Sequence, residues 1–264
     1  MSKFKIYLSV TIILVLLTLF LINYIFFFKT NFRVLHAGGI YKDEIHTNSL
    51  VALDKNKKGF KYLELDFQMT TDKKLVCLHD LKNNLSYDNF LKDNIIKNVK
   101  NCDYISLSNW LIKNPNKIII TDVKSKNNLE ALEFIKNNFK NYNKVFIPQI
   151  YNPENYESVK KLGYEKIIWT LYRYGHNNFE EIINIIKKNK YFAITITPER
   201  ARSGLSKEIR KETNTNVLVH TINFRRDRVN LIFLYDVTDV YTDRILFDVN
   251  NIFSWFLKKR IIDD

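Results

Sequence analysis

From residue 31 onward, short apolar runs alternate with amphipathic stretches. The runs are rich in β-branched and aromatic residues, which is typical of buried strands. In one intervening stretch Phe179, Ile182, Ile183 and Ile186 recur at helical spacing, so we expect a helix on the outside of a sheet. Repeated units of this kind predict a parallel sheet covered by helices. The nine candidate strands are RVLHA, YLELDF, KLVCLHD, KIIITDV, KVFIPQI, KIIWTLY, YFAITIT, NVLVHTI and VTDVYTD.

The fold class we predict is α/β, a TIM (β/α)8 barrel. Nine runs compete for eight barrel positions, and YLELDF and KLVCLHD follow each other without a helix between them. One of the two is therefore an accessory strand, or both belong to the first part of the barrel. An open doubly wound sheet fits less well, because HAGG lacks the spacing of a dinucleotide-binding loop. A helix should start near Thr47 or Asn48, which can cap it, and end at Gly59.

Residues 7–28 are almost wholly apolar, and a helix needs roughly twenty such residues to cross a bilayer. A cleaved signal peptide fits less well, because FFFKTNF lacks the small residues of a cleavage site. We expect a membrane anchor at residues 1–30 and a barrel domain at residues 31–264. Lys3 and Lys5 before the span favour a cytoplasmic N-terminus, although the basic residues after it weaken the asymmetry. We therefore expect a single-pass membrane protein whose barrel domain is extracytoplasmic.

The formal net charge is +13, and three lysines flank the apolar segment. Without them 38 basic and 28 acidic residues remain, which favours anionic partners such as phosphate esters or acidic lipids. The lysines are scattered and form no dense basic arm, so we expect no nucleic-acid partner.

The two cysteines are too few for a metal-binding cysteine cluster. Cys77 and Cys102 could form one disulfide, but Cys77 lies in the apolar run LVCL, which favours a small buried thiol.

Several ionisable residues fall at the ends of predicted strands, where the catalytic groups of TIM barrels lie. Glu64 and Asp66 alternate with apolar residues and should share one face of a strand. Two carboxylates pointing together repel each other unless a cation joins them, and Ca²⁺ or Mg²⁺ is the simplest candidate. His36, His79 and Asp122 also end apolar runs.

Each of these residues also has a structural alternative. A histidine at the end of a strand is often a hydrogen-bonded structural residue, and Glu64 and Asp66 could face solvent. Lys124 lies two residues after Asp122, so the two could form a local ion pair. Because so many such residues occur at strand ends, we favour a single shared site.

Other polar residues carry less weight. Gln149 ends KVFIPQI and could line the site, while His220 could contact substrate or merely pack. His46 and His176 lie in predicted loops, and we interpret both as incidental.

The ordered series HAGG, TNSLVALDKNKKGFKYLELDF and TTDKKLVCLHD resembles the opening of the glycerophosphodiester phosphodiesterase family, which is related in fold to phosphatidylinositol-specific phospholipases C. A weaker resemblance continues through IIITDVK and VLVHTIN. The resemblance implies the following roles: His36 and His79 as the acid/base pair, Glu64, Asp66 and Asp122 as metal ligands, and Lys124 as a phosphate contact.

Three departures from the family pattern bear on function. Ala37 stands where the family has an arginine, Thr47 where it has a helix-start glutamate, and Asp122 where it has a longer glutamate. The predicted activity is metal-dependent hydrolysis of a phosphodiester that carries glycerol or another polyol. The alternatives are a lyase that stops at a cyclic phosphate, as phospholipases C do, and an inactive barrel that binds a phosphorylated glycan or lipid.

Overall fold

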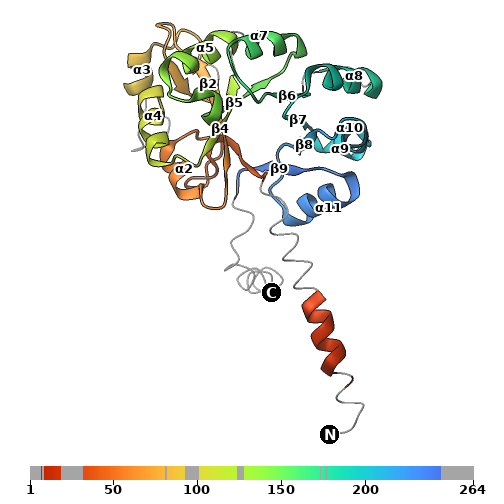
Figure 1. Ribbon diagram of the computed structural model, residues 1–264. Coiled ribbons are helices and arrows are strands. Elements are labelled where there is room, and N and C mark those ends of the chain that lie inside the picture. The colour runs from red at the N-terminus through yellow and green to blue at the C-terminus, as the bar shows by residue number, and fades with distance from the viewer. Residues whose placement is uncertain are drawn as a thin grey trace. The chain divides into compact units, whose positions relative to one another are not determined.

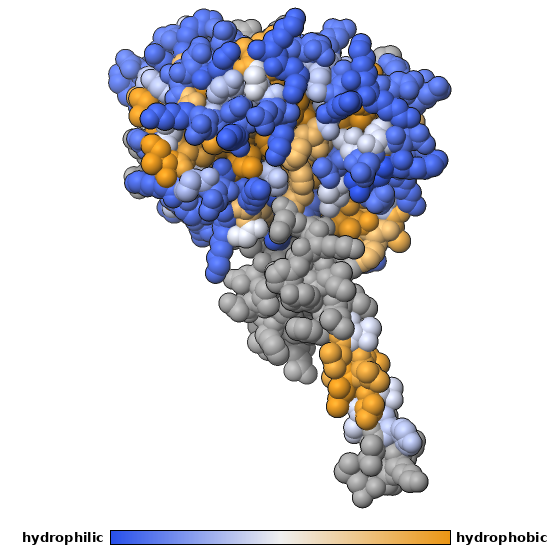
Figure 2. Space-filling model, viewed as in Figure 1, coloured by the Kyte–Doolittle hydropathy of each residue, from blue (hydrophilic) through white to orange (hydrophobic). Residues whose placement is uncertain are grey.

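The computed structural model describes residues 7, 9–18, 32–80, 82–92, 101–123, 128–172, 174–175 and 178–244. The chain divides into two compact units, Met1–Asn31 and Phe32–Asp264, which are described separately. In the first unit residues 9–18 are helical and expose apolar side chains (Figure 2). Within the described part of the chain, no helix is both long and apolar enough to cross a membrane.

Eight parallel strands of the second unit close into a barrel (Figure 1). The closure is made by β1, which pairs in parallel with both β2 and β9. The predicted TIM-type barrel is thereby confirmed. The barrel strands are β1 (Val34–Leu35), β2 (Tyr62–Met69), β4 (Ile118–Val123), β5 (Phe146–Ile150), β6 (Ile168–Thr170), β7 (Ala193–Ile196), β8 (Asn216–Val219) and β9 (Asp239–Thr242).

A ninth strand, β3 (Leu75–Cys77), pairs antiparallel with the end of β2. The run KLVCLHD is therefore the accessory strand, and the chain continues from it to His79. Cys77 forms a disulfide with Cys102, so the interpretation of Cys77 as a free buried thiol was wrong. The backbone N–H of Cys77 also donates to the Cys102 carbonyl at 2.9 Å.

Helices surround the strands (Figure 1). They are α2 (Leu50–Asn56), α3 (Tyr87–Lys92), α4 (Tyr104–Lys113), α5 (Asn128–Asn138), α6 (Tyr142–Val145), α7 (Tyr156–Lys161), α8 (Phe179–Asn189), α9 (Pro198–Arg202), α10 (Leu205–Thr213) and α11 (Arg225–Tyr235), with 3₁₀ turns η1 (His36–Gly38) and η2 (Pro153–Asn155). As predicted, α8 buries Ile182, Ile183 and Ile186.

The cap of α2 differs from the prediction. Ser49 Oγ accepts the N–H of Ala52 at 3.0 Å, so Ser49 rather than Thr47 or Asn48 caps the helix. Gly39 of HAGG lies close to this helix. A Cβ at this position would lie 2.9 Å from a Leu35 methyl and 3.0 Å from Asn56 Nδ2. The glycine thus allows close packing against α2.

The inside of the barrel consists of an apolar layer and a polar layer. One buried cluster takes a hydrophobic residue from every barrel strand: Val34, Tyr62, Ile120, Ile147, Ile168, Ala193, Leu218 and Tyr241. Side chains two residues apart on a strand point to the same face. Two residues after these, every position is polar: His36, Glu64, Asp122, Gln149, Thr170, Thr195, His220 and Asp243. The fold therefore brings eight polar side chains together next to one apolar layer.

Candidate active site

Three carboxylates meet on two adjacent strands. Asp66 of β2 and Asp122 of β4 are register partners, and Glu64 precedes Asp66 by one pleat. All three side chains are buried, and one oxygen of each lies within 4.8 Å of the others. Buried carboxylates this close repel one another strongly. A hard divalent cation, which prefers oxygen ligands, fits this set of donors.

Neighbouring groups orient each of these carboxylates. The backbone N–H of Ala37 donates to Glu64 Oε2 at 2.7 Å, and Asn48 Nδ2 donates to Asp66 Oδ2 at 2.8 Å. The hydroxyl of Tyr151 lies 2.9 Å from both oxygens of Asp122. Such outer contacts orient the ligands of a metal site. Asp122 therefore joins the group although it is shorter than the glutamate of the family pattern.

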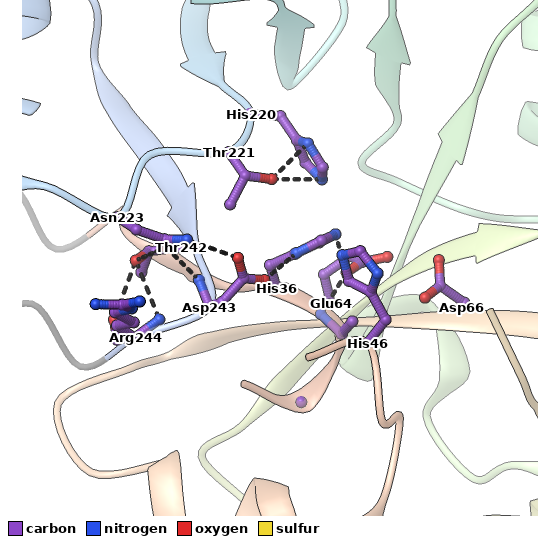
Figure 3. Close-up of polar contacts among 12 residues, drawn as sticks. His36, His46, Glu64, Asp66, His220, Thr221, Asn223, Thr242, Asp243 and Arg244 are labelled. Carbon is purple, nitrogen blue, oxygen red and sulfur yellow. Dashed lines mark hydrogen bonds and ion pairs between the residues drawn. The ribbon is translucent and has the colours of Figure 1, made fainter. Parts of the chain in front are cut away.

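His36 is hydrogen-bonded to a buried aspartate. Its Nδ1 donates to Asp243 Oδ1 at 2.5 Å, while its Nε2 lies 3.8 Å from Glu64 Oε2 (Figure 3). Asn223 Nδ2 donates to the other Asp243 oxygen at 2.8 Å. Burial raises the pKa of Asp243, but the hydrogen bonds from His36 and Asn223 and the charges of His36 and His46 together leave the pKa below its ordinary value. Asp243 is thus a carboxylate that keeps the His36 proton on Nδ1.

Three further histidines lie around His36. The ring of His220 meets it edge-on at 4.2 Å between centroids, and the ring of His46 does so at 4.9 Å. His46 in turn stacks on His79, with centroids 4.3 Å apart and planes 12° apart. His79 Nδ1 lies 2.7 Å from Asp80 Oδ1. His46, which we interpreted as incidental, thus lies with its ring against both predicted acid/base residues.

The remaining predicted residues have different positions. Gln149 lies inside the barrel, where its Oε1 accepts the hydroxyl of Tyr241 at 2.9 Å. Burial raises the pKa of Tyr241 well above 10, so this hydroxyl stays protonated and donates. His220 also contacts the ring of Tyr172, at 5.2 Å. Lys124 lies outside the described residues.

Sequence reasoning missed Asp243, Asn48 and His46. Asp243 ends the run VTDVYTD just as Asp122 ends its own run, so the strand-end rule could have found it. His46 and Asn48 have φ angles of 57° and 48° in an irregular segment, where no periodic pattern predicts the direction of a side chain.

The fold is a TIM barrel, and the site lies where the catalytic groups of such barrels are found. The site combines buried carboxylates able to hold a cation with a histidine–aspartate pair at the same end of the barrel. The model of the Glycerophosphoryl diester phosphodiesterase family matches residues 38–208, and the chain belongs to this family as a divergent member.

Solved structures support the fold assignment. A glycerophosphodiester phosphodiesterase from Parabacteroides distasonis is 18% identical with a TM-score of 0.65, covering 81% of this chain and 94% of its own. An enzyme of the same description from Agrobacterium tumefaciens is 16% identical with a TM-score of 0.60, covering 80% and 96%. One from Thermotoga maritima is 18% identical with a TM-score of 0.58, covering 83% and 96%. None of the curated proteins matches the chain. At these identities the likeness concerns the fold.

Proposed function

We propose that this chain hydrolyses a phosphodiester that carries glycerol or a similar polyol, with Ca²⁺ or Mg²⁺ as cofactor. The observation that carries the proposal is the meeting of three buried carboxylates with the His36–Asp243 pair at one end of the barrel. Glu64, Asp66 and Asp122 would hold the cation. When bound, it would supply positive charge that polarises the phosphoryl group and offsets developing negative charge.

The two histidines act as acid and base in this proposal. Asp243 keeps a proton on His36 Nδ1, so Nε2 is the atom that takes or gives a proton. The Nδ1 of His79 is likewise occupied by Asp80, which leaves its Nε2 for proton transfer. Because imidazole titrates near neutral pH, one ring can start as base and the other as acid.

Substrate contacts belong to the proposal as well. We assign them to Lys124, Gln149 and His220 from their places at strand ends in the sequence. His220 has the most support, because its ring lies 4.2 Å from that of His36.

The test is turnover of glycerophosphodiesters by wild type, His36→Ala and His79→Ala, with Ca²⁺, Mg²⁺ or EDTA. Each substitution should lower kcat by roughly 10²- to 10⁴-fold, the usual contribution of an acid or base. Asp236→Asn, a change at the end of α11, serves as the matched control. Absence of wild-type turnover with any cation would refute the proposal.

Product analysis decides between the enzymatic alternatives. A cyclic phosphate as the final product would indicate the lyase. Cation binding without turnover, unchanged by His79→Ala, would indicate an inactive binding barrel, for which the missing family arginine at Ala37 is the motivating observation.

We also propose that residues 1–30 anchor the chain in a membrane and that residues 31–264 form an extracytoplasmic domain. The long apolar run supports the anchor, and the Cys77–Cys102 disulfide is typical of an oxidising compartment. Protease added to intact cells should cleave the domain, and detergent should be needed to extract it. A domain protected until the cells are lysed would contradict this orientation.

A further inference from the structure

The two histidines proposed as acid and base differ in how far they and their aspartate partners are buried. His36 and its partner Asp243 are both buried, with side chains 6% exposed. His79 is 34% exposed, and its partner Asp80 is 90% exposed. An exposed pair of charged or polar side chains contributes little to holding a fixed geometry, because solvent competes for it. His79 therefore needs a second contact to keep its ring oriented.

The ring of His46 provides that contact. It lies nearly parallel to the ring of His79, at 12° and 4.3 Å, close to the distances of stacked aromatic pairs. The His46 ring also contacts His36 edge-on, at 83° and 4.9 Å, which further restricts its orientation. Burial, followed by the charges of His36 and His79, lowers the pKa of His46. A neutral ring can occupy this place without repelling a protonated neighbour.

A hydrogen-bonded side chain connects the backbone of His46 to β2, the strand that carries Glu64 and Asp66. Asn48 Nδ2 donates both to the His46 carbonyl, at 3.3 Å, and to Asp66 Oδ2, at 2.8 Å. The N–H of Leu78, next to His79, donates to the Asp66 carbonyl at 3.0 Å. These hydrogen bonds connect the segments of both stacked histidines to Asp66. The distance between the two rings therefore depends on the position of β2.

We propose that His46 is a positioning residue for catalysis, whose flat ring holds the His79 imidazole in place against the carboxylate site. This inference rests on the proposed function, in which His79 transfers a proton. It assigns His46 no proton transfer of its own.

The test compares His46→Ala with His46→Phe, which keeps a flat ring but no imidazole nitrogen. The alanine variant should lose roughly 10- to 100-fold in kcat with KM changed less than about threefold, because misplacing a catalytic group by about 1 Å has effects of this size. The phenylalanine variant should recover kcat to within about threefold of wild type. Ile45→Ala, a change at the exposed neighbour in the same segment, controls for disturbance of the backbone and should leave kcat unchanged.

A second readout does not depend on turnover. In NMR spectra of isotope-labelled histidine, the ring resonances of His79 should shift in His46→Ala, because the stacked ring is lost. If the alanine variant fails to fold, His46→Leu fills the same space without a flat ring and takes its place. If wild type shows no turnover, the proposed function fails and the His79 shift alone decides the positioning. An unchanged His79 resonance, an unchanged kcat in His46→Ala, or a phenylalanine variant as impaired as the alanine variant would each overturn the inference.

Discussion

Replacing Asp243 by asparagine isolates the negative charge that faces His36 Nδ1. The side chain keeps its size, and Asn223 can still contact it, but the amide no longer favours the required proton position. A hydrogen bond to a charged group contributes roughly 1.5–3 kcal/mol. Since each 1.36 kcal/mol is tenfold in rate, kcat/KM should fall by roughly 10- to 150-fold.

The assay is kcat/KM for a glycerophosphodiester at saturating cation, with Asp236→Asn as control. Because the pKa of Asp243 is lowered in the folded chain, its carboxylate stabilises the fold above its ordinary pKa, and this contribution is lost as pH falls through the folded value. Asp243 is therefore ionised in wild type at every pH above about 5. Over that range the loss of kcat/KM in Asp243→Asn, relative to wild type, should be similar at each pH. A value of kcat/KM within twofold of wild type would refute the assignment of Asp243.

Three further predictions concern stability. Removing the disulfide by Cys77→Ala with Cys102→Ala should lower the free energy of unfolding in urea by about 3.5 kcal/mol, since the cysteines are 25 residues apart; a loss under about 1 kcal/mol would contradict this. Arg228 and Asp239 form a buried bidentate ion pair, with N–O distances of 2.7 and 3.0 Å. Arg228→Met should therefore lower the free energy of unfolding by roughly 3–5 kcal/mol. A melting temperature like that of wild type would contradict this. Burial, followed by the charges of the neighbouring histidines, lowers the pKa of His46 below 6.5. As pH drops, His46 is therefore protonated in the unfolded chain before it is in the folded chain, and the free energy of unfolding should fall below pH 6.5. A His46→Phe variant whose stability has the same pH slope would contradict this.

Much of the barrel and part of the site could be predicted from periodicity. Alternating strands and helices predict the fold, and the two-residue period of a strand places Glu64 with Asp66. The same period relates the hydrophobic cluster of the interior to the polar layer above it. Applied to VTDVYTD, it would also have included Asp243.

The remaining features depend on contacts that no local pattern encodes. His36 and Asp243 are 207 residues apart and meet only because β1 closes the barrel against β9. His46 reaches the site through left-handed backbone and the side chain of Asn48. The disulfide requires β3 to fold back on β2, which the apolar character of LVCL does not reveal.

The most direct test of the central claim is the dependence of glycerophosphodiester turnover on Ca²⁺ or Mg²⁺ concentration, in wild type and Asp122→Asn. We predict saturable activation that EDTA abolishes, with a half-saturating concentration raised roughly tenfold or more in the variant. Full turnover in EDTA, or identical activation curves for the two proteins, would contradict the assignment of the carboxylates to a catalytic cation.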